Sequence, residues 1–370
     1  MEDLITLFIR ICSSSKARRR ILIIGLILTI FIFYLNHTFI EERRRKSRFL
    51  KDCFHNALPL HVEPLPEIGA AAAHTPAGKQ NAFFLETSCS TPAATINLNP
   101  RQLCAIESAA KNSPNWQIHV LFASNIGFSN DSTTREFKML DAVLSKYENI
   151  KFLRLNITNY AERTPLEEWM RDGRMFDSDY VNSHLSDVLR YLTLFKYGGT
   201  YLDLDVVVLR NLDEAGVNYS GAESDEDVAA GFMNMEPAGF GHQVAELCVK
   251  DLLDNFDGYN WGNNGPGVIT RVLQTLCGTQ NPRKMIRDRC YGFHVYPPDG
   301  VYAIPWRQFR KFFDVKEAEE TLAKLENSFI AHLWNKHSHK VKLKVGSKAA
   351  YATLAARHCP QVYANCGEYF

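Results

Sequence analysis

The stretch SDVLRYLTLFKYGGTYLDLDVVVLRNL, from Ser186 to Leu212, places two carboxylates, Asp203 and Asp205, inside an apolar run of strand-forming residues. In a strand, residues two apart point to the same face, so this spacing predicts that both carboxylates converge on one side. Burying an unpaired carboxylate is costly. Two together therefore indicate a divalent cation, a cationic partner, or a strand end that is open to water.

The segment ahead of this run has the pattern of a helix followed by a tight turn. Apolar residues recur at helical spacing from about Ser183 to Tyr197, and Gly198–Gly199 is a stop signal. If the strand begins near Thr200, the two aspartates fall beyond its carboxyl end, where open α/β sheets bind ligands. Asp187 and Arg190 share one face of the predicted helix, although such a pair alone is most often a solvated salt bridge.

Helical and strand-like segments alternate through the rest of the chain beyond residue 81. This alternation predicts an α/β fold with a mainly parallel central sheet covered by helices. The elements expected in the first half are a strand near Phe83, a helix at about Pro100 to Ala110, a strand at Ile118 to Ala123, a helix around Arg135 to Lys146 and a strand at Ile150 to Leu155.

The N-terminal region carries one apolar segment. Residues 21–40 contain no charged side chain and, at about 1.5 Å per residue, are long enough to span a bilayer. Basic residues flank this segment on both sides, so their distribution does not decide its orientation. We expect residues 1–20 to form a tail, 21–40 a membrane anchor, 41–80 a stem and 81–370 a folded domain. The formal net charge of +1 implies no general affinity for nucleic acid.

Cysteines and glycosylation signals favour a lumenal body. Eight of the nine cysteines follow the apolar segment, an even number that is compatible with disulfides in an oxidising compartment. Short spacing suggests the pairs Cys89–Cys104 and Cys359–Cys366, among the 105 pairings that eight cysteines allow. Acceptor sequences for N-linked glycans occur at Asn130, Asn156 and Asn218.

Four blocks of sequence resemble one family of glycosyltransferases. The blocks are HLSDVLRYLTLFKYGGTYLDLDVVVLRNL, which contains the D-x-D motif, FFLETS at 83–88, WGNNGPGVITRVL at 261–273 and HLWNKHS at 332–338. Their order and composition resemble the family of lactosylceramide 4-α-galactosyltransferase and α-1,4-N-acetylglucosaminyltransferase. The resemblance implies a nucleotide-sugar-binding domain of the GT-A type.

The resemblance also assigns roles to individual residues. It implies that Asp203 and Asp205 bind Mn²⁺ or Mg²⁺ at the donor diphosphate, with His332 as a third protein ligand. The implied donor-binding residues are Glu86, Thr87 and Ser88 near the nucleotide, Asp187 and Arg190 at the sugar hydroxyls, Asn263 and Asn264 where donor and acceptor meet, Lys336 at the diphosphate and Trp334 closing over the site. From the residues alone, His332 also fits a surface histidine, Trp334 a core side chain, and the Asn-Gly string a simple turn.

The expected activity follows from the same resemblance. A retaining enzyme of this family would move galactose or N-acetylgalactosamine from its UDP donor, in α-1,4 linkage, to a terminal sugar of a glycosphingolipid such as lactosylceramide or a longer one. The expected location is the Golgi membrane. With the resemblance, residues 1–20 are expected to be a cytosolic tail, 21–40 a signal anchor, 41–80 a stem and 81–370 a lumenal catalytic domain. Two alternatives stay open: transfer to protein-linked glycans, and a catalytically inactive sugar-binding protein on a membrane tether. The sequence alone identifies no catalytic nucleophile.

Overall fold

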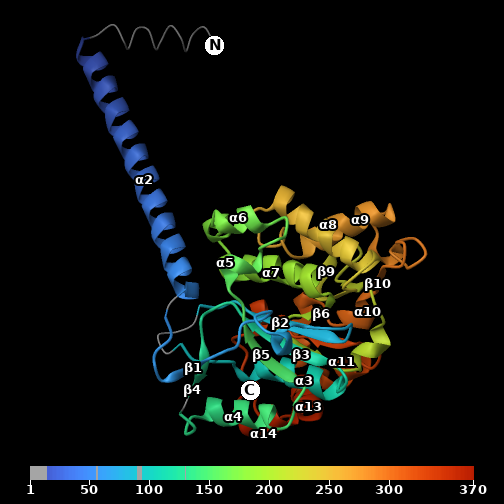
Figure 1. Cartoon of the computed structure of the whole chain (residues 1–370). Coiled ribbons are helices and arrows are strands. Elements are labelled where there is room, and N and C mark those ends of the chain that lie inside the picture. Colours follow the sequence, from blue (N-terminus) through green and yellow to red (C-terminus); the bar gives the residue numbers. More distant parts are fainter. Residues whose placement is uncertain (1–14, 56, 90–93, 130) are drawn as a thin grey trace. The chain divides into compact units, whose positions relative to one another are not determined.

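The computed structural model describes residues 15–55, 57–89, 94–129 and 131–370, and these form two compact units that divide between Asp52 and Cys53 (Figure 1). The first unit consists of most of helix α2 (Ser15–His55). Within α2, residues Ile23–Arg45 have a mean hydropathy of 2.1, and this helix is long and apolar enough to cross a membrane. The span agrees with the predicted anchor at 21–40, and it is the one such helix in the described part of the chain.

The second unit is built on a seven-stranded sheet with the strand order β10-β8-β9-β6-β2-β3-β5. Pairing is parallel except at β9, which runs antiparallel to both of its neighbours. The mainly parallel α/β sheet predicted from the alternation of segments is therefore confirmed. The strands are β2 (Asn81–Glu86), β3 (Gln117–Phe122), β5 (Ile150–Arg154), β6 (Gly199–Leu202), β8 (Tyr219–Ala222), β9 (Val228–Met235) and β10 (His294–Tyr296).

Helices cover the sheet on both sides, with α7, α8 and α9 on one side and α3, α13 and α14 on the other (Figure 1). Local signals explain several helix ends. Asn99 caps α3 in a capping box with Gln102, and Gly198 ends α7 with a positive φ of 61°. The helices are α3 (Pro100–Asn112), α4 (Arg135–Leu144), α5 (Ile157–Tyr160), α6 (Glu167–Arg171), α7 (Val181–Tyr197), α8 (Phe240–Asn255), α9 (Pro266–Cys277), α10 (Pro298–Val301), α11 (Ala318–Lys324), α12 (Asn335–Ser338), α13 (Ala350–His358) and α14 (Pro360–Asn365).

The D-x-D motif lies in a turn directly after β6, beyond the carboxyl end of that strand as expected, and the aspartates are not themselves part of a strand. Strand β6 ends at Leu202, and the Asp203 N–H donates to the carbonyl of Gly231 as the chain leaves the large sheet. The chain then enters β7 (Val206–Val208), which pairs antiparallel with β11 (Ile330–His332) in a separate two-stranded sheet. The two carboxylates still converge, because the turn between two sheets directs both toward the same space.

The compact unit begins earlier than the expected stem boundary at residue 80. Strand β1 (Val62–Pro64) pairs with β4 (Gly127–Ser129), and Leu65 and Ile68 are buried. The segment after Cys53 therefore packs with the sheet domain instead of forming a separate spacer.

The disulfides differ from the suggested pairs Cys89–Cys104 and Cys359–Cys366. The described bonds are Cys53–Cys89, Cys104–Cys359 and Cys277–Cys290, while Cys248 and Cys366 are free and buried. Short spacing was misleading because tertiary packing places α3 against α13 and α14, and this brings together cysteines that are 255 residues apart.

The acceptor sequences for glycans have different surroundings. Asn156 caps α5, whereas the side chain of Asn218 is buried and donates to Glu236 at 2.9 Å. A glycan on Asn218 does not fit this fold. Asn130 lies outside the described residues.

Candidate active site

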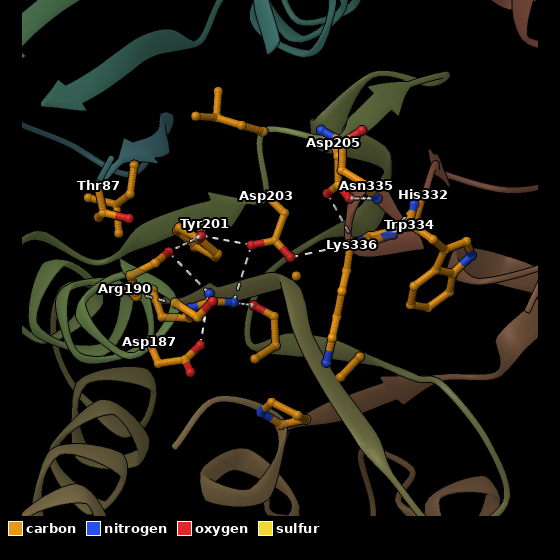
Figure 2. A pocket seen from close by; sticks show the side chains of 18 of the residues that line it. Thr87, Asp187, Arg190, Tyr201, Asp203, Asp205, His332, Trp334, Asn335 and Lys336 are labelled. Carbon is orange, nitrogen blue, oxygen red and sulfur yellow. Dashed lines mark hydrogen bonds and ion pairs between the residues drawn. The ribbon is translucent and has the colours of Figure 1, made fainter. Parts of the chain in front are cut away.

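A cavity of about 670 Å³ opens where β2, β6 and β8 end, which is the carboxyl edge of the sheet (Figure 2). This position agrees with the rule for ligands in open α/β sheets. Ten of the residues predicted from the sequence line it: Glu86, Thr87, Ser88, Asp187, Arg190, Asp203, Asp205, His332, Trp334 and Lys336. The structure thus brings together predicted residues from three separate blocks of the sequence.

Asp203, Asp205 and His332 form a compact cluster in the cavity wall. One ligand atom from each lies within 4.8 Å of the others. The His332 Nε2 is 3.3 Å from Asp205 Oδ1 and 3.5 Å from Asp203 Oδ2. Pairing of β7 with β11 sets this geometry, because Val206 lies directly opposite His332 in the ladder.

The electrostatics of this cluster suit a cation. Burial raises the pKa of Asp205, and Asp203 raises it further while His332 opposes the rise. Burial would lower the pKa of His332, but Asp205 and Asp203 outweigh this effect and raise it. Two carboxylates and one imidazole are a donor set that suits Mn²⁺ or Mg²⁺. For Nε2 to bind a cation, the ring proton must move to Nδ1, and the 3.2 Å contact of Nδ1 with the Trp334 N–H must lengthen.

Arg190 holds the cluster from the side of α7. Its guanidinium stacks on Tyr201, with Cζ 4.6 Å from the ring centroid, and its side chain is 9% exposed. The Nη1 group contacts Asp203 Oδ1 at 3.2 Å and the Ala230 carbonyl at 2.9 Å. The Nη2 group contacts Asp187 Oδ1 at 2.9 Å and Ser186 Oγ at 3.2 Å, and Nε donates to the Ser186 carbonyl. Three of these contacts, with the Ala230 carbonyl and with the carbonyl and hydroxyl of Ser186, are hydrogen bonds, and those with Asp187 and Asp203 are ion pairs. The guanidinium is therefore surrounded by partners from the protein itself.

Asp187 differs from Arg190 because only one of its carboxylate oxygens is used in this ion pair. Burial raises the pKa of Asp187 to about 7, with Arg190 opposing the rise. The α9 loop approaches this carboxylate closely: a Cβ built on Gly265 would lie 2.4 Å from Asp187 Oδ1. Gly265 is therefore required by close approach, which explains a glycine at this point of the Asn-Asn-Gly-Pro-Gly string.

Asn263 and Asn264 do not line the cavity formed by the described residues, so the structure does not bring them together with the other ten predicted site residues. Asn264 is 0% exposed and exchanges two hydrogen bonds with the backbone of Asp257. Asn263 donates to the Asn255 carbonyl and accepts from Arg271. Both amides brace the loop ahead of α9, a structural role that a short sequence string does not reveal.

The string after β11 contributes to the opposite side of the cavity. The Asn335 N–H donates to Asp205 Oδ2 at 2.6 Å, and the Trp334 indole donates to the Ile304 carbonyl at 2.8 Å. Trp334 has a positive φ of 55°, an uncommon conformation for a residue with a side chain. The Lys336 Nζ lies 3.1 Å from the ring centroid of Trp261, which joins this string to the α8–α9 loop.

Several residues of the site were not found from the sequence. The Tyr201 hydroxyl donates to Asp203 Oδ1 at 2.7 Å. A Cβ built on Gly231 would lie 2.5 Å from Asp203 Oδ2 and 3.2 Å from Tyr302 Oη. A glycine inside an apolar strand is a known sign of close approach, so Gly231 could have been found. Glu223, whose pKa is raised by burial, also lines the cavity, as do Trp261, Trp306 and His337.

Comparison with known proteins agrees with this site. Residues 237–366 match a family described as Alpha 1,4-glycosyltransferase conserved region, and residues 99–222 match one described as Glycosyltransferase sugar-binding region containing DXD motif. The lactosylceramide 4-alpha-galactosyltransferase of Mus musculus is 34% identical over 283 residues, which cover 76% of this chain and 75% of the mouse protein. The Homo sapiens alpha-1,4-N-acetylglucosaminyltransferase is 26% identical over 289 residues, covering 77% of this chain and 80% of that protein.

Among solved structures, the galactosyltransferase LgtC in complex with donor and acceptor sugar analogs covers 77% of this chain and 95% of its own. Its sequence identity is 14% and its TM-score is 0.36, a likeness too low to bear on individual residues.

The carboxylate and histidine cluster at the carboxyl edge of the sheet lies in a chain whose similarity to the mouse protein extends over three quarters of both sequences. The chain therefore belongs to the lactosylceramide 4-alpha-galactosyltransferase family of D-x-D glycosyltransferases.

Proposed function

We propose that this protein is a retaining hexosyltransferase that moves galactose or N-acetylgalactosamine from a UDP donor, in α-1,4 linkage, onto the terminal sugar of a glycosphingolipid. The observation that carries this proposal is the cluster of Asp203, Asp205 and His332 in a cavity of about 670 Å³. Family membership supports the linkage and the glycolipid acceptor, because the mouse relative is named for lactosylceramide and for a 4-alpha-galactosyl product.

Asp203, Asp205 and His332 would hold Mn²⁺ or Mg²⁺. The bound cation would neutralise the negative charge that grows on the diphosphate as its bond to the anomeric carbon breaks. Lys336, on the same side of the cavity as His332, would contribute a further positive charge to the diphosphate. Glu86, Thr87 and Ser88, at the end of β2, would contact the nucleotide.

Asp187 and Arg190 would have different roles in donor binding. Because Arg190 already makes three hydrogen bonds and two ion pairs within the protein, this side chain would position Asp203 and Asp187 and would not itself contact the sugar. Asp187, which keeps an oxygen free of that ion pair, would accept a hydrogen bond from a hydroxyl of the donor sugar. This division revises the expectation that both residues contact the sugar.

The proposed setting is the Golgi membrane, with α2 as the anchor and the sheet domain in the lumen. The apolar span at Ile23–Arg45 supports a single-pass anchor, and the disulfides Cys53–Cys89, Cys104–Cys359 and Cys277–Cys290 support an oxidising compartment. Residues 1–20 would then face the cytosol.

The test is transfer by the full chain in detergent-solubilised membranes. UDP-galactose, UDP-N-acetylgalactosamine and UDP-N-acetylglucosamine would each be combined with lactosylceramide and with longer glycosphingolipids. We expect one of the first two donors to yield a product whose new linkage is α-1,4 by methylation analysis. Transfer to protein-linked glycans alone, or UDP-sugar binding without transfer to any acceptor, would contradict the proposed function.

A further inference from the structure

Trp306 presents an exposed ring to the active-site cavity. It begins the 3₁₀ segment Trp306–Phe312, lines the cavity and is 38% exposed. The proposed cation-binding residues Asp203, Asp205 and His332, hereafter the metal cluster, make no described interaction with it. The proposed donor-binding residues make none either. A large ring left partly open to water in a ligand cavity costs hydrophobic free energy that a ligand can recover by covering it.

The ring is held in place from behind. Trp306 stacks on His337 with centroids 5.0 Å apart and an interplanar angle of 19°. His337 stacks in turn on Phe309 at 6.1 Å and 26°. The Arg307 guanidinium lies 5.0 Å from the Trp306 centroid. The stack of Trp306, His337 and Phe309, hereafter the aromatic stack, is therefore organised before any ligand binds.

The aromatic stack belongs to one side of the cavity. Figure 2 shows Thr87, Asp187 and Arg190 on one side of Asp203, and His332, Trp334 and Lys336 on the other. His337 directly follows Lys336 in α12, so the aromatic stack extends the second side. The Trp334 indole bond to Ile304 ties α12 to the chain just ahead of Trp306. The segment from Ile304 to Trp306 and the segment from Trp334 through α12 thus form a continuous aromatic surface beside the metal cluster.

We propose that Trp306 is the platform of the acceptor subsite, where it stacks against the apolar face of the terminal sugar of the acceptor glycan. This assignment rests on the proposed function and names the part of the cavity that receives the acceptor. The C–H groups on one face of a galactose ring carry slight positive charge, and they complement the negative face of an indole. Such stacking would also cover the exposed part of the ring.

The alternative occupant is the uracil of the donor, which also stacks on aromatic rings. The proposed nucleotide contacts, Thr87 and Ser88, end β2 beside α7, where Thr87 donates to the Asn182 carbonyl. Trp306 instead contacts α12, on the other side of the metal cluster. The geometry therefore favours the acceptor sugar, and the test separates the two occupants.

The experiment compares the full chain with its Trp306→Ala and Trp306→Phe variants. The probes are UDP-galactose and UDP-N-acetylgalactosamine as donors, and soluble methyl β-lactoside and methyl β-galactoside as acceptors. Three quantities are measured for each protein: the acceptor KM, the rate of donor hydrolysis without acceptor, and UDP affinity with Mn²⁺ by calorimetry. Tyr291→Ala is the matched control, because this ring is 74% exposed and is not part of the cavity lining in the described chain.

We expect Trp306→Ala to raise the acceptor KM about tenfold, which corresponds to about 1.4 kcal/mol. Donor hydrolysis and UDP affinity should stay within twofold, Trp306→Phe should recover most of the acceptor affinity, and Tyr291→Ala should resemble the unchanged protein. A parallel loss of UDP affinity would assign Trp306 to the uracil and overturn the acceptor subsite. An unchanged acceptor KM would also overturn it, while the proposed function would stand through transfer by the unchanged protein. If the unchanged protein used neither soluble acceptor, nor lactosylceramide, nor a longer glycosphingolipid, the proposed function itself would fail, and the subsite with it.

Discussion

The two sides of the cavity differ in their interactions: one consists of ion pairs and the other of exposed aromatic rings. On the α7 side, Asp187, Arg190 and Asp203 form a chain of ion pairs, and Arg190 also donates three hydrogen bonds to oxygens of the protein. On the α12 side, Trp306 and His337 are exposed rings that stack on one another. On the first side, Arg190 is held by protein groups before a ligand binds, while one oxygen of Asp187 stays outside the ion pair. The second side has exposed aromatic surface that a ligand can cover. A site that binds a charged donor and then a neutral acceptor sugar would use both a charged side and an aromatic side.

This contrast decides which substitutions are informative. Removing one partner of a buried ion pair leaves an uncompensated charge and destabilises a protein by about 3 to 5 kcal/mol. In alanine variants of Arg190 or Asp187, a fall in activity could therefore come from unfolding as well as from the lost contact in the site. Isosteric variants keep the volume and the packing, so their activity reports on the contact. Exposed rings such as Trp306 carry no such penalty, so alanine is an acceptable probe there.

The largest expected effect is at the metal cluster. Asp203→Asn and Asp205→Asn each remove one charge with little change in volume, and we expect transfer to fall by about a thousandfold, since hard cations need carboxylate oxygens. An excess of chelator should abolish activity, and added Mn²⁺ should restore it. Rates are measured on variants whose thermal unfolding matches the unchanged protein, with the exposed Asp225→Asn as control. Near-normal transfer by both variants would remove the metal role.

The second prediction separates Asp187 from Arg190. Asp187→Asn should lower transfer and donor hydrolysis about tenfold or more while UDP affinity with Mn²⁺ stays within about threefold, because only a sugar contact is weakened. Arg190→Lys should lower transfer by about ten- to a hundredfold and also weaken UDP binding, since an ammonium cannot hold Asp203, Asp187 and two carbonyls at once. Calorimetry with UDP is the deciding measurement. Equal losses of UDP affinity in both variants would show that the pair acts as one unit.

The third prediction tests the close packing behind Asp203. Gly231→Ala would place a methyl group 2.5 Å from Asp203 Oδ2, so the carboxylate must move. We expect transfer to fall about tenfold, in line with the loss that a small misplacement of catalytic groups causes. Gly300→Ala is the control, because its nearest new contact would be an ordinary 3.7 Å. Equal activity of the two variants would show that the position of Asp203 tolerates displacement.

The smallest effect is expected behind the aromatic stack. His337→Ala removes the ring on which Trp306 rests without removing Trp306 itself, and aromatic pairs contribute about 0.5 to 1.5 kcal/mol. We expect the acceptor KM to rise about two- to threefold and donor hydrolysis to stay unchanged, as measured by steady-state kinetics with methyl β-lactoside. A larger effect than that of Trp306→Ala would mean that His337, and not Trp306, contacts the acceptor.

Local sequence signals determined a large part of the fold and of the site. The helical periodicity before Gly198, the glycine stop signal and the apolar strands each act over a few residues, so their elements were predicted close to their observed bounds. The D-x-D pair was recognisable because charge inside an apolar run is costly wherever the chain goes. The anchor segment was equally clear, since about 20 apolar residues suit the thickness of a bilayer.

Tertiary structure alone decided how these parts act together. His332 reaches Asp205 because β7 pairs with β11 across more than a hundred residues, and no local pattern encodes that pairing. The same holds for Cys104–Cys359 and for the Asn264 amide, which braces a loop instead of lining the cavity. Whether an arginine is available to a substrate depends on every group around it, and the hydrogen-bond and ion-pair partners of Arg190 come from two helix residues, the D-x-D turn and β9. Residue types and short spacings therefore determined the chemistry that is present, while long-range packing decided which atoms remain available to a substrate.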